Sequence, residues 1–450
     1  MQPFRYHVVM CTQQKVENVP CCAAAGAAAA VNALRAELDR QRLADQVLVS
    51  TTGCLGACEH GPVMIVYPDA TWYGKATAAE IPEIVRSHLG AGQPVERLRI
   101  ADMPGLRQEI LDHRQQYFAM LRAQEASGVL PEQFNELMMG FQTSRTALTA
   151  VELDLFTAVG KGAGAREVAA KLNTNPRATE MLLNAVASLG LLEKRNGIFF
   201  NTPTTARFLV EGSPDYSRFA VMHFVHLWPR WSTLTECVRE GKAMHTRERD
   251  DPFNRAFISA MDRIAKAQAP PTVAVIPADG AKRMLDLGGG SGAYSIAMAQ
   301  AHPQLQVDVF DLPGVVPMTQ EYIRQAGLQE RVHTRVGNLL SDDFGENYDL
   351  ILLSAISHSF TPDQNRDFFR RAYAALAPGG RFIVREFILE PDKTSPRWAA
   401  LFSLNMLVGT DGGASYSEAE YEEWLRDSGF NEVRRVRMPG PSNLMIATRQ

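Results

Sequence analysis

The stretch MLDLGGGSGAYS, residues 284–295, decides the fold of the second half of this 450-residue chain. An apolar strand ends at Asp286, and a helical pattern begins about six residues later. The intervening loop carries three alternating glycines, Gly288, Gly290 and Gly292. Without side chains there, the backbone can approach a bound nucleoside closely. The stretch therefore predicts a nucleotide-type cofactor loop between a strand and a helix.

The charge beside this loop bears on which cofactor it holds. Gly288-x-Gly290-x-x-Ala293 also satisfies the dinucleotide pattern, but a pyrophosphate at the helix N-terminus would meet the carboxylate of Asp286. A ligand with an ammonium group and no phosphate, such as S-adenosylmethionine, fits better. Asp311, at the end of the next strand, is placed to accept hydrogen bonds from ribose hydroxyls. The alternative is a glycine turn with solvated carboxylates.

Around the loop, residues 276–450 alternate strand-like and helical segments. The strand-like runs are RMLDLGG, QVDVFDL, RVHTRVGN, YDLILLSAI and GRFIVREFIL. This alternation predicts an α/β fold, a Rossmann-like doubly wound and mostly parallel sheet, closed by an antiparallel hairpin at the C-terminus.

Residues 131–275 are mainly helical, and residues 101–130 have the pattern of a helical connector. Two helices broken at Thr-Asn-Pro and a strand pair turning at Asn196-Gly197 predict a winged helix. Its second helix offers only Arg177 as a cation, which favours packing or dimerisation over binding nucleic acid.

Composition narrows the class of protein further. The chain has 46 basic and 50 acidic residues and a formal net charge of −4, with no long run of one sign to bind nucleic acid or a membrane surface. No stretch approaches the roughly 18 uninterrupted apolar residues of a membrane span, and the N-terminus lacks the pattern of a secretory signal. We expect a cytoplasmic protein.

From about residue 131 onward the chain resembles class I S-adenosylmethionine-dependent O-methyltransferases of the acetylserotonin and caffeate type. The resemblance is carried by LDLGGGSG, FDLP, YDLILLSAISH, LAPGGRFIV and the terminal hairpin. It implies a homodimer formed through the helices of residues 131–225 and a small-molecule methyl acceptor. The cofactor contacts that it implies are Asp286, Gly288, Gly290, Gly292, Asp311 and Asn338. The Asn338 side chain can accept a hydrogen bond from the adenine amino group.

His358 ends the strand YDLILLSAISH and matches the general base of that family. Imidazole can take the proton of a hydroxyl acceptor at neutral pH. Three residues depart from the family pattern: Asn338 replaces an aspartate, Ser415 stands where plant enzymes carry an acidic residue that orients the base, and Ser354 replaces a lysine. The base is thus expected to be weakly supported, and methylation of carbon or nitrogen stays open.

Cysteines gather in the first 58 residues, where five of the six occur. Residues 1–100 have the pattern of a small α/β unit, and in a reducing cytosol such clustering favours a metal or redox centre over disulfides. Cys54-x-x-x-Cys58 precedes an apolar strand, and a closed tetrahedral set needs two more ligands.

Residues 1–100 resemble the thioredoxin-like 2Fe-2S ferredoxins, through HVVMC, CAAAG, TTGCLGACEHGPVMIVYPDATWYG and AGQPVERL. The resemblance implies a 2Fe-2S cluster on Cys11, Cys22, Cys54 and Cys58, with Cys21 as an alternative to Cys22. Structural zinc and unligated thiols are the other possibilities.

The sequence thus predicts a fusion of four parts: a ferredoxin domain (1–100), a connector (101–130), a winged-helix dimerisation region (131–275) and a methyltransferase domain (276–450). The expected activity is methyl transfer to a small aromatic or tetrapyrrole-like acceptor, with the cluster serving redox coupling, oxygen sensing or an electron-transfer partner. The alternative is an electron-transfer or redox-sensing protein whose methyltransferase body only binds ligand.

Overall fold

A computed structural model describes residues 3–15, 19–127, 132–244 and 251–450. The chain forms two compact units, Met1–Met139 and Gly140–Gln450. The predicted boundary between connector and dimerisation region, at residues 130 and 131, lies outside the described residues.

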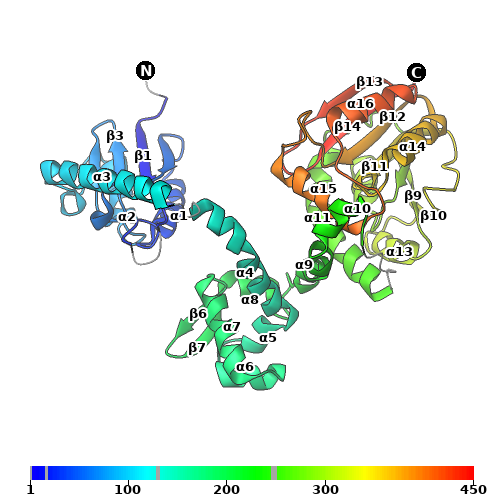
Figure 1. Ribbon diagram of the computed structural model, residues 1–450. Helices are drawn as coiled ribbons and strands as arrows, with labels where there is room; N and C mark the ends of the chain where they lie inside the picture. Colours follow the sequence, from blue (N-terminus) through cyan, green and yellow to red (C-terminus); the bar gives the residue numbers. More distant parts are fainter. Residues whose placement is uncertain (1–2, 16–18, 128–131, 245–250) are drawn as a thin grey trace. The chain divides into compact units, whose positions relative to one another are not determined.

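The first unit is built on a four-stranded sheet of order β2-β1-β3-β4 (Figure 1). Its strands are β1 (Tyr6–Cys11), β2 (Val47–Thr52), β3 (Met64–Tyr67) and β4 (Thr71–Tyr73). β1 pairs parallel with β2 and antiparallel with β3, and β3 continues antiparallel into β4. Its helices are α1 (Ala27–Arg40), α2 (Ile81–Ile84), which continues into a π-turn (Val85–Gly90), α3 (Met103–Ser127), and short turns at Cys58–His60 and Glu96–Leu98. The predicted α/β character of residues 1–100 is confirmed.

Helix α3 is more than a connector. Leu106 is buried in a small apolar cluster with Cys11 and Cys22, and Ile110 packs against the same cluster. Residues four apart lie on one face of a helix, so a single face of α3 is directed at the cysteine region. The first turns of α3 therefore belong to the core of the first unit.

The second unit begins with helices and a small sheet. The helices are α4 (Glu132–Glu152), whose first residues belong to the first unit, α5 (Leu155–Val159), α6 (Ala165–Leu172), α7 (Pro176–Ser188), α8 (Pro203–Leu209), α9 (Arg218–Trp231), α10 (Leu234–Glu240) and α11 (Asp251–Val273). The sheet has the order β5-β7-β6, from β5 (Ala163–Gly164), β6 (Leu192–Arg195) and β7 (Ile198–Asn201). Asn196 and Gly197 both have positive φ, as a two-residue hairpin turn requires, so the predicted hairpin is confirmed.

The rest of the second unit is organised by a seven-stranded sheet of order β10-β9-β8-β11-β12-β14-β13. The strands are β8 (Arg283–Leu287), β9 (Gln306–Asp311), β10 (Val332–Val336), β11 (Tyr348–Ser354), β12 (Leu376–Glu386), β13 (Asn431–Val436) and β14 (Asn443–Thr448). The first five pair in parallel, and β14 is antiparallel to both β12 and β13. The predicted doubly wound sheet and its closing hairpin are both present.

Helices cover both faces of this sheet. The connecting helices are α12 (Ala293–Ala301), α13 (Val316–Gln325), α14 (Pro362–Ala375), α15 (Arg397–Gly409) and α16 (Glu418–Asp427). Residues of α11, α12 and α13 pack into one apolar core, while α14 and α16 pack into the other. The strand order reverses between β8 and β11, so their carboxyl ends flank the crevice where such sheets bind ligands.

No helix within the described residues is both long and apolar enough to cross a membrane.

Candidate functional site

The glycine loop lies at the carboxyl end of β8, beside this crevice. Gly288, Gly290 and Gly292 all have positive φ, a conformation that other residues rarely adopt. A Cβ on Gly288 would come within 2.8 Å of the Ile356 side chain. A Cβ on Gly290, by contrast, would meet no atom within 4 Å. The loop therefore leaves open space above Gly290, as the approach of a nucleoside to its backbone requires.

Asp286 is a buried carboxylate at the end of β8, only 1% exposed. Its Oδ2 accepts a hydrogen bond of 2.6 Å from the Ser295 hydroxyl, whereas Oδ1 has no partner within the described residues. Burial raises the pKa of Asp286 to about 7; the nearby Asp311 also raises it, and the hydrogen bond from Ser295 lowers it. A ligand ammonium group would satisfy the free oxygen and stabilise the ionised form.

Asp311 ends β9 and ties the glycine loop to that strand. Its carboxylate accepts the backbone N–H of Gly290 at 2.8 Å and that of Leu312 at 2.7 Å. Asn338 follows β10, and its side-chain oxygen accepts the N–H of Leu340 at 3.0 Å. All the predicted cofactor residues thus follow or end adjacent strands. The contacts of Asp311 with ribose and of Asn338 with adenine stay predictions.

His358 follows β11 and is paired with Glu386, the last residue of β12. The imidazole Nδ1 lies 2.8 Å from Glu386 Oε2, and the backbone N–H of His358 donates to Glu386 Oε1 at 3.3 Å. Glu386 is 1% exposed and His358 9% exposed. With Nδ1–H donated to the carboxylate, Nε2 carries the lone pair that can accept a proton.

Glu386 is not among the residues predicted from the sequence, and the His358–Glu386 pair corrects the expectation that the base is weakly supported. Ser415, at the position of the missing acidic residue, is buried and its Oγ has no partner within the described residues. The carboxylate comes instead from β12. The only indication of Glu386 in the sequence is that it is the acidic residue at the end of the strand-like run GRFIVRE.

Aromatic rings surround the imidazole. Phe387 stacks on His358 with ring centroids 5.9 Å apart, and Phe402 of α15 meets it edge-on at 4.9 Å. Trp398, also on α15, packs against Phe387 and Phe402 and is 47% exposed. The aromatic wall, as we call Phe387, Trp398 and Phe402, offers an apolar surface of inclined rings beside the candidate base.

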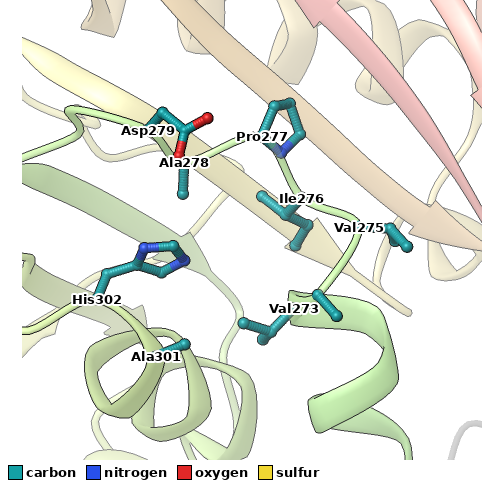
Figure 2. A pocket seen from close by; sticks show the side chains of 9 residues that line it. Val273, Val275, Ile276, Pro277, Ala278, Asp279, Ala301 and His302 are labelled. Carbon is teal, nitrogen blue, oxygen red and sulfur yellow. The ribbon is translucent and has the colours of Figure 1, made fainter.

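A separate open pocket of about 350 Å³ lies at the other end of the sheet (Figure 2). It is lined by the segment from Val273 to Asp279, which precedes β8, and by Ala301 and His302, which precede β9. These are the amino ends of parallel strands, opposite the glycine loop. None of the predicted site residues lines this pocket.

In the first unit the four predicted ligand cysteines come together as two pairs. Cys54 Sγ and Cys58 Sγ are 3.7 Å apart. Cys11 and Cys22 are hydrogen-bonded, and this bond from Cys22 lowers the pKa of the Cys11 thiol to about 6 against the opposing effect of burial. The hydrogen bond with Cys11 and burial raise the pKa of Cys22, and the charge of Cys58 adds to this increase.

The pairs are not arranged as one ligand set. Within the described residues, no group of three or more His, Cys, Asp or Glu side chains is placed to hold a metal ion. The spare Cys21 accepts the N–H of Ala24 at 3.4 Å, which favours Cys22 as the partner of Cys11. Lys15 donates to Cys58 Sγ at 3.0 Å, and its charge also reaches Cys54. Two pairs of thiols beside a cation fit an anionic thiolate centre in number and chemistry, but they do not form the geometry of a single four-ligand set in the described residues.

Helix α3 covers the loop that carries Cys54 and Cys58. Ile110 lies against Gly56, where an added Cβ would come within 3.2 Å of it. His113 Nδ1 is 2.5 Å from the Gly56 carbonyl oxygen, and Glu109 accepts the N–H of Glu59 at 3.3 Å. The cysteine loop is therefore held between the sheet and α3.

Comparison with known proteins agrees with this architecture. Residues 231–431 match the O-methyltransferase domain, residues 135–211 the O-methyltransferase dimerisation domain, and residues 2–88 the thioredoxin-like [2Fe-2S] ferredoxin. The chain is 37% identical over 322 residues to 3-hydroxy-5-methyl-1-naphthoate 3-O-methyltransferase of Streptomyces sahachiroi, an alignment that covers 69% of this chain and 92% of the relative. It is 31% identical to the tetracenomycin polyketide synthesis 8-O-methyl transferase TcmO of Streptomyces glaucescens, covering 70% and 96% respectively.

A solved structure of PigF with S-adenosylhomocysteine superimposes with a TM-score of 0.67 at 29% identity, covering 71% of this chain and all of that one. The chain therefore belongs to the S-adenosylmethionine-dependent O-methyltransferases and is an enzyme. Membership of an enzyme family disfavours the alternative in which the methyltransferase body only binds ligand.

Proposed function

We propose that this enzyme methylates a hydroxyl group on a flat aromatic acceptor, with His358 as the general base and Glu386 as its positioning residue. The observation that carries the proposal is the buried His358–Glu386 pair beside the aromatic wall. An acceptor ring packed on that wall would have its hydroxyl within reach of the imidazole. The phenolic and polyketide acceptors named for the two relatives support the same class.

Bound S-adenosylmethionine supplies an electrophilic methyl group on a sulfonium. His358 Nε2 takes the acceptor proton as the O–CH₃ bond forms and the S–CH₃ bond breaks, leaving S-adenosylhomocysteine. Glu386 holds the Nδ1–H tautomer and stabilises the resulting imidazolium. Asp286, the three glycines, Asp311 and Asn338 are proposed to hold the cofactor.

The test is methyl transfer from radiolabelled S-adenosylmethionine to a panel of phenols that begins with 3-hydroxy-5-methyl-1-naphthoate. Each phenol has a control acceptor whose hydroxyl is already methylated. We expect label in the phenols alone. Label in the methylated controls would indicate methylation at carbon and contradict the proposal.

We also propose that the chain acts as a homodimer. The match to the dimerisation domain supports this, as do four exposed apolar residues at helical spacing on α4: Phe134, Leu137, Met138 and Phe141. An apolar helix face of this kind is typical of a protein–protein contact.

We also propose that the chain is divided into four parts, with boundaries at residues 100, 130 and 275.

For the first unit we propose a 2Fe-2S cluster held by Cys11, Cys22, Cys54 and Cys58, serving redox coupling or sensing. The ferredoxin match and the pairing of Cys11 with Cys22 and of Cys54 with Cys58 support it. Anaerobic purification with metal analysis tests it: we expect iron and a visible absorption that dithionite bleaches. A colourless protein with one zinc would contradict the cluster.

A further inference from the structure

Arg385, the residue before Glu386, is a buried cation at the end of β12. Side chains alternate along a strand, so Arg385 projects from the face opposite Glu386 and its partner His358, and the residue is 5% exposed. The guanidinium donates to Ser354 Oγ at 3.4 Å and to the side-chain oxygen of Gln268 on α11. Its Cζ lies 4.9 Å from the ring centroid of Tyr294. All three of these partners are uncharged.

Within the described residues, no carboxylate lies within ion-pair distance of Arg385. Arg435 provides the contrast, because its side chain is 4% exposed and pairs with both Glu390 and Glu418. Burying a charge without a counter-charge costs several kcal/mol. Burial lowers the pKa of Arg385 and the neighbouring Glu386 raises it, so an anion in direct contact with the guanidinium would stabilise its charge further.

Tyr294 supplies an independent observation. It is 8% exposed, and within the described residues its hydroxyl makes no hydrogen bond of good geometry, although Thr272 lies close enough to lower its pKa. The nearby Thr272 donates its own hydroxyl to the Gln268 carbonyl at 2.8 Å. A buried hydroxyl without a well-placed partner is uncommon, and here it lies beside a guanidinium whose hydrogen-bond partners are all uncharged.

The position of this pair relates it to the cofactor crevice. Arg385 is aligned with Ser354 at the carboxyl end of β11, which pairs with β8 beside the glycine loop. Tyr294 comes two residues after Gly292; burial raises its pKa, the nearby Arg385 lowers it, and Asp286 also raises it. The strand pairing thus places the cation of Arg385 near the carboxyl end of β12 and the free carboxylate oxygen of Asp286 near the carboxyl end of β8. An α-amino acid has the complementary arrangement, an ammonium and a carboxylate on one carbon.

We propose that Arg385 and Tyr294 form a carboxylate-binding site that holds the methionyl carboxylate of the cofactor, opposite Asp286 at the ammonium. The inference rests on the cofactor of the enzyme family and adds two residues of this chain to its site. The other possible source of a carboxylate for this site is an acceptor that itself carries a carboxylate group.

Calorimetry separates these sources. The probes are S-adenosylhomocysteine, which carries the amino-acid end, and methylthioadenosine, which lacks it. For Arg385→Met we expect S-adenosylhomocysteine to bind about 10- to 150-fold more weakly, the range for a lost charged hydrogen bond, while methylthioadenosine binds as to wild type. Tyr294→Phe should weaken only S-adenosylhomocysteine, by about 2- to 10-fold.

Arg381→Met is the matched control, since Arg381 is on the same strand and the same face but donates to the Pro277 carbonyl at 3.0 Å. Retained binding of methylthioadenosine by Arg385→Met shows that the variant is folded. Equal loss of both nucleosides, or unchanged binding of both, would overturn the proposal. If Arg385→Met lost affinity only for 3-hydroxy-5-methyl-1-naphthoate, and not for 2-naphthol, which lacks a carboxylate, Arg385 would bind the carboxylate of the acceptor. This result would overturn the assignment of Arg385 to the cofactor. If the wild-type protein bound neither nucleoside, the assignment of S-adenosylmethionine as the cofactor would be refuted.

Discussion

Glu386→Gln changes one atom of the candidate catalytic pair and leaves its shape intact. The Glu386 carboxylate accepts three hydrogen bonds: from His358 Nδ1 at 2.8 Å, from the His358 backbone N–H at 3.3 Å and from the Phe387 backbone N–H at 3.2 Å. A glutamine has one oxygen and one NH₂ group. Either orientation therefore sets its NH₂ against a donor.

If the glutamine NH₂ faces the imidazole, Nδ1 must become the acceptor and Nε2 then carries the proton. His358 in that tautomer cannot take a proton from the acceptor. If the NH₂ faces the backbone instead, the imidazolium loses its counter-charge. A hydrogen bond to a charged group contributes about 1.5 to 3 kcal/mol, which corresponds to a rate loss of about 10- to 150-fold.

Single-turnover methyl transfer to 3-hydroxy-5-methyl-1-naphthoate measures this loss, with calorimetric binding of S-adenosylhomocysteine as the check on folding. Glu390→Gln is the control, because Glu390 is four residues later and pairs with Arg437. A Glu386→Gln enzyme as fast as wild type would refute the assignment of Glu386 as the positioning residue.

Three further outcomes are expected. Burial raises the pKa of Asp286 to about 7, and an ammonium ligand needs the ionised carboxylate, so the affinity for S-adenosylhomocysteine should increase from pH 5 to pH 8. Binding below pH 7 should release a proton from Asp286, and Asp286→Asn should abolish the pH dependence. A calorimetric affinity that does not change with pH would contradict this prediction. Cys54→Ser should lose iron and visible absorption, whereas Cys237→Ser in the second unit should keep both. Metal analysis measures the iron content of the two variants. Equal iron in both would contradict the proposed ligand set. Leu137→Glu should shift the protein from dimer to monomer in light scattering while Val238→Glu does not, and a persistent Leu137→Glu dimer would count against the α4 interface.

Local patterns predicted much of the fold. The glycine loop and the Asn196-Gly197 turn need positive φ, which few residue types provide, so sequence alone indicates their geometry. The buried strands of the parallel sheet are nearly continuous apolar runs, so β8 and β11 could be located before the structure was known.

Contacts between distant segments could not be predicted in this way. Glu386 meets His358 across 28 residues because β11 and β12 pair in one register. Residues 101–130 have a polar helical pattern typical of a connector, and only the structure shows Ile110 of α3 against the cysteine loop. The pairing of Cys11 with Cys22 rather than Cys21 likewise depends on a turn geometry that spacing does not reveal.

The most direct test of the account is turnover of His358→Ala alongside its binding of S-adenosylhomocysteine. We predict cofactor affinity within about twofold of wild type and a loss of phenol methylation of about 10² to 10⁴, the usual contribution of a general base. Unchanged methylation by His358→Ala, with the cofactor still bound, would show that this histidine is structural and that the proposed chemistry is wrong.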